Sequence, residues 1–127
     1  MVDTSRRTIA DIVGPAFTIK SLSARFGKPE SEIRAAIEAG DILSLPTTDG
    51  VNLMPASQFG PDGQPLPGLR VVLAELRRGH DDAWLHAQFL AAKSPLHDDR
   101  TIAGELRAGE LLDVLALAIQ TAEAWSA

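Results

Sequence analysis

The chain reads TIKSLSARFGKPESEIRAAIEAG over residues 18–40, and this stretch predicts two short helices joined by a tight turn. Thr18 is of a residue type that caps helices, and apolar residues recur at helical spacing over residues 20–26. Gly27 ends this helix, because glycine takes the left-handed conformation without steric cost. Pro29 begins the second helix, whose first turn tolerates a residue without a backbone N–H.

Two short apolar runs follow, ILSL at residues 42–45 and VNLM at residues 51–54. They flank TDG at residues 48–50, and an Asp-Gly turn between apolar runs is typical of a β-hairpin. Together the pattern predicts a winged helix-turn-helix over residues 18–54, whose second helix would enter the major groove of DNA. The candidate DNA-contacting residues are Arg25, Lys28, Ser31 and Arg34.

The second helix also carries three carboxylates, Glu30, Glu32 and Glu38, which phosphates would repel. The formal net charge is −5: residues 1–64 hold six basic and eight acidic side chains, and residues 65–127 hold six and nine. A nucleic-acid binder usually shows a basic excess, because phosphate neutralisation supplies most of the non-specific affinity. The alternative interpretation is therefore a helix–hairpin element that serves packing or dimerisation.

The stretch GPDGQPLPG at residues 60–68 predicts a linker or a well-fixed loop, since no regular element tolerates three glycines and three prolines in nine residues. It divides the chain into a helix-turn-helix part (1–59), the loop (60–68) and a helical part (69–127). Apolar residues at helical spacing predict four helices in the last part. These span residues 69–79, about 82–93, 101–107 and 110–125, and a further short helix is predicted over residues 8–13.

The predicted fold class is thus mainly α: a winged helix-turn-helix with a small hairpin, followed by a compact four-helix unit. The chain has no cysteine, so neither disulfides nor thiolate metal sites can hold it together. No stretch approaches the roughly 18 to 20 apolar residues that cross a bilayer, and the first residues lack the apolar block of a signal peptide. We therefore expect a cytoplasmic protein that does not enter a membrane.

Two His-Asp-Asp triplets, at residues 80–82 and 97–99, are the candidate metal ligands. Each precedes a predicted helix, and helix capping is the preferred interpretation because the triplets match no metal-binding signature. His86 has no serine or cysteine partner and is expected at the surface or in an interface, not as a general base. Nucleophile elbows and phosphate-binding loops are missing too, so we expect no enzymatic activity, no cofactor and no metal.

Several pieces of the second half follow one another in a recognisable order. They are GQPLPGL (63–69), Trp84, FL (89–90), SP (94–95), IAGELRAGE (102–110) and VLALA (114–118). In this order they resemble the toxin-binding domain of the Xre/MbcA/ParS antitoxin family. The resemblance implies a homo-oligomeric antitoxin that neutralises a RES-domain, NAD-consuming toxin by direct binding, with the cofactor belonging to the toxin. The candidate toxin-contacting residues are Trp84, Arg107, Glu123 and Trp125.

The first half resembles the winged helix-turn-helix of excisionase and MerR-like proteins, in TIKSLSARFG at residues 18–27 and IEAGDIL at residues 37–43. This resemblance adds operator DNA as a second expected partner, through which an antitoxin of this kind would repress its own operon. Two alternatives stay open. One is a free-standing DNA-binding regulator whose C-terminal helices dimerise, and the other is a ligand- or metal-binding module built on the two His-Asp-Asp triplets.

Overall fold

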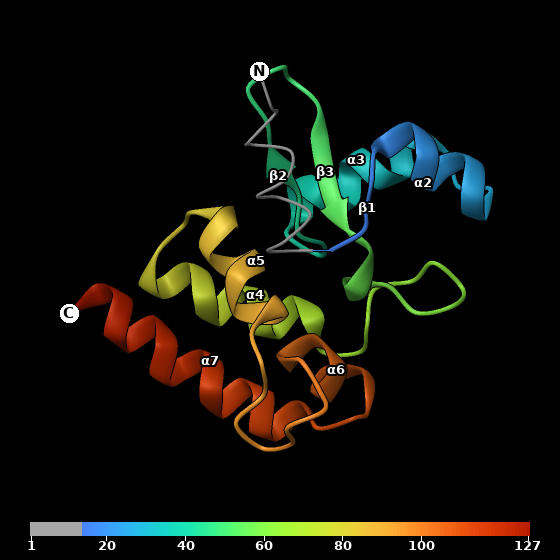
Figure 1. Cartoon of the computed structure of the whole chain (residues 1–127). Helices are drawn as coiled ribbons and strands as arrows, with labels where there is room; N and C mark the ends of the chain where they lie inside the picture. Colours follow the sequence, from blue (N-terminus) through green and yellow to red (C-terminus); the bar gives the residue numbers. More distant parts are fainter. Residues whose placement is uncertain (1–13) are drawn as a thin grey trace, which may run out of the picture.

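A computed structural model gives the structure of the protein and describes residues 14–127. The described part is mostly helical, with six α-helices and a small antiparallel sheet (Figure 1). In chain order the elements are β1 (Ala16–Phe17), α2 (Ile19–Phe26), α3 (Glu30–Ala39), β2 (Leu45–Pro46), β3 (Asn52–Pro55), the 3-10 turn η1 (Ala56–Gln58), α4 (Leu69–Gly79), α5 (Ala83–Ala91), α6 (Ile102–Arg107) and α7 (Leu111–Ser126). The helix predicted over residues 8–13 lies outside the described residues.

Local capping explains the first two helices, as the sequence predicts. The Thr18 side chain accepts from the backbone N–H of Ser21 at 3.0 Å, and the Ser21 side chain accepts from that of Thr18 at 2.8 Å, so two N–H groups at the start of α2 are satisfied. Gly27 ends α2 and Gly40 ends α3, each with a positive φ. The predicted pair of helices and its glycine turn are confirmed.

The sheet has the strand order β1-β3-β2. The predicted hairpin is confirmed, with Leu45 opposite Leu53 and Pro46 opposite Asn52, although its strands are shorter than the apolar runs. Strand β1 was not predicted: two residues are too few to show an alternating pattern.

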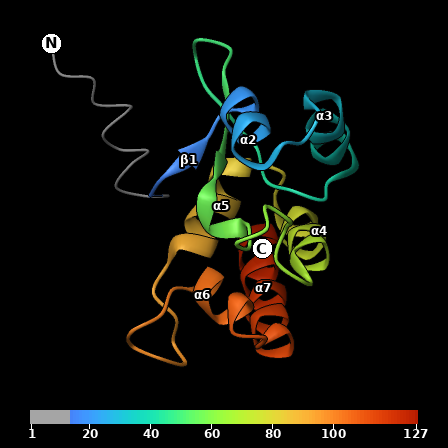
Figure 2. The same cartoon turned by 90° about the vertical axis from the view of Figure 1, so that its right-hand side faces the viewer.

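The sheet separates two hydrophobic clusters, because successive side chains of a strand point to opposite faces. Leu43 and Leu45 are buried with the apolar side chains of α4–α7, and Leu53 packs against the same cluster. Ile42 and Met54 are buried instead with Leu22, Ile33 and Phe59, beneath α2 and α3. Figure 2 shows α2 and α3 at the upper end of the molecule and the C-terminal helices at the lower end. Since its apolar side chains enter both clusters, the hairpin packs against both groups of helices.

Helices α4 and α7 lie side by side and parallel, forming the centre of the C-terminal unit (Figure 1). Their starts meet where Gly68 lies against the Leu111 side chain, and their ends meet where Gly79 lies against the backbone of Ala122. Small residues permit this close approach, and the side chains that fill the interface are fully buried. They are Leu69, Val72, Leu73, Leu76, Val114 and Ala118.

The glycine- and proline-rich segment 60–68 forms a fixed loop, the second of the two alternatives that its composition left open. Its ends are held by backbone bonds from Gly60 to the carbonyl of Gln64 and from Leu66 to that of Gln58, both 2.8 Å long. The buried Gln58 side chain in turn clamps the backbone of Leu43, accepting from its N–H at 2.7 Å and donating to its carbonyl at 2.8 Å. The loop is thereby tied to the segment that leads into β2.

A buried carboxylate holds the loop between α5 and α6. Glu105 is fully buried and accepts hydrogen bonds from Ser94 at 2.6 Å and from Arg100 at 2.8 Å, while the His97 ring nitrogen lies 2.7 Å from it. The hydrogen bond from Ser94, with those from Arg100 and His97, lowers the pKa of Glu105 to about 2. A buried charge is tolerated here because it is paired and hydrogen-bonded, and all three partners come from one short loop.

We predict that Gly79→Ala strongly destabilises the protein, because the new Cβ would meet the carbonyl oxygen of Ala122 at 2.3 Å and force α4 and α7 apart. The expected loss is at least about 3 kcal/mol, at the upper end of overpacking costs. Urea unfolding followed by circular dichroism measures it. Gly104→Ala is the matched control, since its Cβ would meet nothing closer than 3.4 Å inside α6 and alanine favours a helix. Equal stability of the two variants would contradict the close contact.

We also predict an acid-labile contribution from Glu105. Its pKa in the folded protein is about 2, below the ordinary value of 4.5, so its stabilising effect is fully present above pH 4.5 and is lost as the pH falls towards 2. Thermal unfolding between pH 7 and pH 2.5 should show this loss in the wild type. Glu105→Gln should be less stable at pH 7 and should lack this part of the pH dependence; parallel pH profiles would rule it out.

Candidate nucleic-acid interface

The outer face of α3 is formed by four exposed residues, the predicted contact residues Ser31 and Arg34 together with Ala35 and Glu38. Helix α3 buries only Ile33 and so offers most of its surface to a partner. Arg34 lies 3.5 Å from Glu30 one turn earlier, with both side chains largely exposed. Such a surface pair contributes little and leaves the guanidinium available to a partner.

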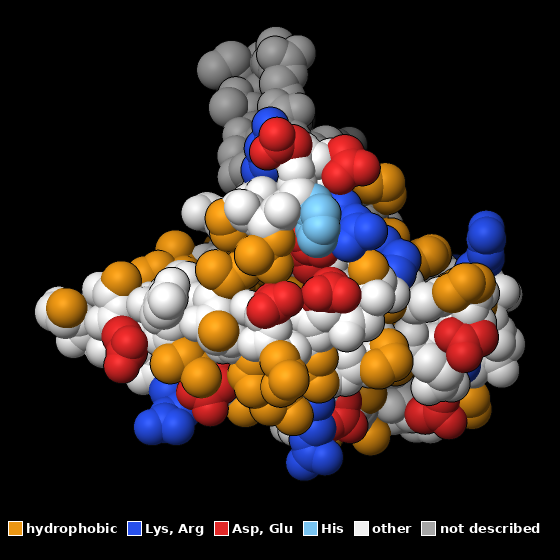
Figure 3. All heavy atoms as spheres, turned by 90° about the horizontal axis from the view of Figure 1, so that it is seen from below, with side chains coloured by type: hydrophobic (Ala, Val, Ile, Leu, Met, Phe, Trp, Pro, Cys, Tyr) orange, Lys and Arg blue, Asp and Glu red, His pale blue; other side chains and the backbone are white. Residues whose placement is uncertain are grey.

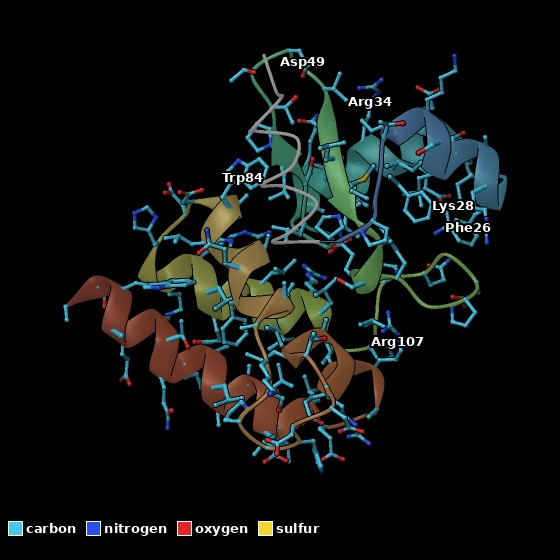
Figure 4. The ribbon with its side chains drawn as sticks, in the orientation of Figure 1. Phe26, Lys28, Arg34, Asp49, Trp84 and Arg107 are labelled. Carbon is cyan, nitrogen blue, oxygen red and sulfur yellow. The ribbon has the colours of Figure 1, made fainter. Side chains whose placement is uncertain are left out.

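The other predicted cations differ in their freedom. Lys28 donates from Nζ to the carbonyl of Gly63 at 2.7 Å, so it ties the 60–68 loop to the turn between α2 and α3 (Figure 4). The loop approaches so closely that a Cβ at Gly63 would lie 2.4 Å from the Phe26 ring. Arg25 is exposed, with its guanidinium 5.9 Å from the centre of the same ring. Lys20, an exposed cation on the first turn of α2, was missed by the sequence reasoning.

The hairpin turn over residues 47–51 lies at the same end of the molecule as α3, away from α7 (Figures 1 and 2). Thr47 donates from its hydroxyl to the carbonyl of Val51 at 2.6 Å and also contacts Asp49. Gly50 has a φ of +81°, which only glycine adopts without strain. The turn is compact and offers the exposed Thr48 and Asp49, but no cation.

Charges in this unit nearly cancel. Residues 14–59 contain four cations, of which Lys28 is already bound, and five carboxylates, for a net charge of −1. The cations are Lys20, Arg25, Lys28 and Arg34, and the carboxylates are Glu30, Glu32, Glu38, Asp41 and Asp49. General attraction to phosphate is therefore weak, and any affinity for a nucleic acid must come from specific contacts.

The predicted toxin-contacting residues do not form one site. Trp84 is half-buried and donates from Nε1 to the carbonyl of Pro46 at 3.3 Å. Arg107 donates to the carbonyl of Ser57 at 2.7 Å, at a distance from Trp84 that Figure 4 shows plainly. Trp125 lies in the last turn of α7 and stacks on His86. Glu123 is exposed beside a hollow of about 310 Å³ between the ends of α4 and α7.

Helix α7 carries an exposed apolar stripe next to Glu123. Leu112 is 81% exposed and Ile119 41% exposed, with the exposed Ala116 between them on the same face. Figure 3 shows hydrophobic side chains gathered in the middle of the face on which α7 lies. A contiguous apolar patch on a protein surface can mark a site that binds another protein.

The histidine predictions are partly wrong. His86 is buried, not at the surface: its Nε2 lies 2.6 Å from the carbonyl of His80, and burial lowers its pKa. Asp82 caps α5 by accepting from the N–H of Trp84 at 2.9 Å, which confirms capping for the first triplet. The second triplet does not cap α6, because Thr101 does.

Chemistry at these polar residues is limited by their geometry. Glu105 lies between Ser94 and His97 and binds both, so the histidine does not contact the serine hydroxyl as a general base would. Within residues 14–127, no group of three His, Asp or Glu side chains is placed to hold a metal ion. In the same range, no helix has the length and apolarity needed to cross a membrane.

Comparisons with known proteins give a fold and no family. No protein-family model matches the chain, and no curated protein matches it. The chain is similar to the NMR structure of Rv2175c, with a TM-score of 0.73 and 18% sequence identity. The similarity covers 85% of this chain and 81% of that one, so it extends over both the sheet-containing half and the C-terminal helices. At this identity, what the two chains share is the fold.

Proposed function

We propose that this protein binds DNA through a winged helix-turn-helix formed by residues 16–59. The observation that carries the proposal is the joint placement of α3 and the hairpin turn at one end of the molecule, with α3 exposed along its outer face. The major groove of B-DNA, about 12 Å wide, admits an α-helix. Helix α3 would lie in the groove, and the turn over residues 47–51 would lie beside the adjacent backbone.

The acidic character of α3 fits direct base recognition better than phosphate contact. Glu38 lies on the outer face of α3, one turn after Arg34 and Ala35. In the major groove a carboxylate can accept a hydrogen bond from the N4 amino group of cytosine. Arg34, Arg25 and Lys20 would supply the phosphate contacts. The resulting protein has low non-specific affinity and relies on a matching site.

Arg34 and Glu38 provide a matched pair of tests. Duplexes are first selected from a randomised pool with the wild-type protein, and affinities are then measured by fluorescence anisotropy over a range of salt concentrations. Arg34→Gln should weaken binding to all selected duplexes alike and make the slope of log K against log salt shallower by about 0.9, the value for one lost phosphate contact.

Glu38→Gln should instead change base preference. Glutamine pairs with adenine in the major groove, so one position of the selected site should shift from cytosine towards adenine, with a change in discrimination of about 1 to 3 kcal/mol. The salt slope should stay the same, because no phosphate contact is lost. Failure of the wild-type protein to enrich any sequence from the pool would sink the DNA-binding proposal.

A second candidate function, toxin neutralisation, is favoured by the apolar stripe on α7. Leu112, near the start of α7, and Ile119, one turn before Glu123, are exposed, and α7 lies at the end of the molecule opposite to α3. A bound protein would remove this stripe from water, at a gain of roughly 25 cal/mol per Å² of apolar surface. An antitoxin could thus hold its toxin through α7 and leave the helix-turn-helix free for operator DNA.

Leu112→Glu tests this candidate function. The variant is co-purified with the protein that is encoded by the neighbouring gene. The substitution places a charge within the proposed contact and should abolish complex formation and growth rescue. Gln120→Glu, exposed on the same helix but off the stripe, is the control and should change neither. Deletion of residues 122–127 is a poorer test, since it removes the buried Ala122 and the Trp125–His86 stack. A neighbouring protein that is neither toxic nor bound would exclude the antitoxin function.

A further inference from the structure

The hairpin turn is closed by its own hydrogen bonds. Besides the bond from the Thr47 hydroxyl to Val51, the N–H of Gly50 donates to the carbonyl of Thr47 at 3.1 Å. The strands that enter and leave the turn pair at Pro46 and Asn52. These bonds hold the turn together, and its direction depends in part on how the hairpin joins the rest of the protein.

The C-terminal unit provides that junction. Leu45 is fully buried among the apolar side chains of α4–α7, and Leu53, opposite it on β3, packs against the same cluster. The base of the hairpin therefore rests on the C-terminal helices as well as on α2 and α3. Pro46 has no backbone N–H, which limits how many ladder bonds the hairpin can form. Contacts from outside the sheet carry correspondingly more weight.

Trp84 makes such a contact at the last paired position before the turn. Its indole N–H donates to the carbonyl of Pro46 at 3.3 Å, and its ring packs at the edge of the C-terminal cluster. The start of α5 is itself fixed, because Asp82 caps the helix at the N–H of Trp84. Figure 4 shows Trp84 reaching from α5 towards the hairpin. The backbone of Trp84 is thus fixed by the helix cap, and the end of its side chain is hydrogen-bonded to the hairpin.

We infer that Trp84 is a positioning residue, through which α5 sets the direction in which the hairpin turn meets a DNA duplex. The duplex as the target rests on the proposed function, whereas the hold on the hairpin does not. Because the turn carries no cation, its contacts with DNA must be hydrogen bonds from neutral groups such as the Thr48 hydroxyl, and these depend steeply on distance and angle. A small change in the direction of the hairpin would be enough to lose them.

The test compares Trp84→Phe, which keeps an aromatic ring but loses the N–H, with Trp125→Phe, which changes the second of the two tryptophans. Amide hydrogen exchange of the free protein is measured first. Trp84→Phe should speed exchange in residues 47–53 about threefold or more and leave α3 unchanged; Trp125→Phe should leave both unchanged. Unaltered exchange in the hairpin, or equal acceleration in the hairpin and α3, would overturn the inference.

DNA binding is measured second, with duplexes selected by the wild-type protein. Trp84→Phe should bind about threefold more weakly with the same base preference, because α3 is unaffected while the hairpin contacts weaken. A general loss of stability would instead speed hydrogen exchange in α3 as well as in the hairpin. If the wild type binds no duplex while Trp84→Phe still loosens the hairpin, the positioning role stands and the DNA-binding proposal fails. Unchanged affinity of Trp84→Phe for a duplex that the wild type binds would overturn the inference.

Discussion

The rest of the structure depends on a sheet that is too small to be stable alone and is buried on both faces. Three strands with two to four residues each cannot form an independent sheet in water. Here Leu53 and Met54 of β3 point into two separate clusters, and Leu43 and Ile42, in the segment that leads into β2, are divided between the same two. Each hydrophobic cluster is covered on one side by the sheet, and the sheet is stabilised by its contacts with both clusters. The two hydrogen bonds between the Gln58 side chain and the Leu43 backbone hold the segment that leads into β2 without using a bond between strands.

Elements with local causes could be predicted from the sequence. Thr18, Gly27 and Asp82 act on residues within one turn of themselves, so helix limits follow from a few neighbouring residues. Contacts over long sequence distances could not be predicted. Strand β1 exists because Ala16 pairs with Pro55, 39 positions away, and nothing in its two residues announces this. Glu105 and His86 were missed as buried groups for a similar reason: their partners lie in loops whose paths the sequence does not reveal.

The sequence predicted which residues of α3 are exposed, but it did not predict what every charged side chain binds. Arg34 and Ser31 are exposed on α3, as its helical periodicity requires. Lys28, predicted to contact phosphate, and Arg107, a candidate from the antitoxin resemblance, instead bind the backbone carbonyls of Gly63 and Ser57 and hold the chain between β3 and α4 in place. A cation on a short helix looks the same in sequence whether it faces solvent or a loop carbonyl. The antitoxin resemblance and the helix-turn-helix interpretation therefore both remain proposals about surfaces, and the fold places those surfaces at opposite ends of one molecule.

The shared sheet also has a consequence for synthesis on the ribosome. Residues 1–59 emerge first, but Leu43 and Leu45 have no cluster to enter until α4 to α7 have followed. At about 5 to 20 residues per second, the remaining 68 residues of the 127 take roughly 3 to 14 seconds to be made. During that interval the nascent sheet leaves exposed the apolar face that Leu45 and Leu53 later bury against the C-terminal helices, and exposed apolar surface of this kind promotes association with other chains. Slow codons beyond residue 59 would prolong this exposure, so translation speed over α4 to α7 becomes part of what keeps the protein folded in a cell.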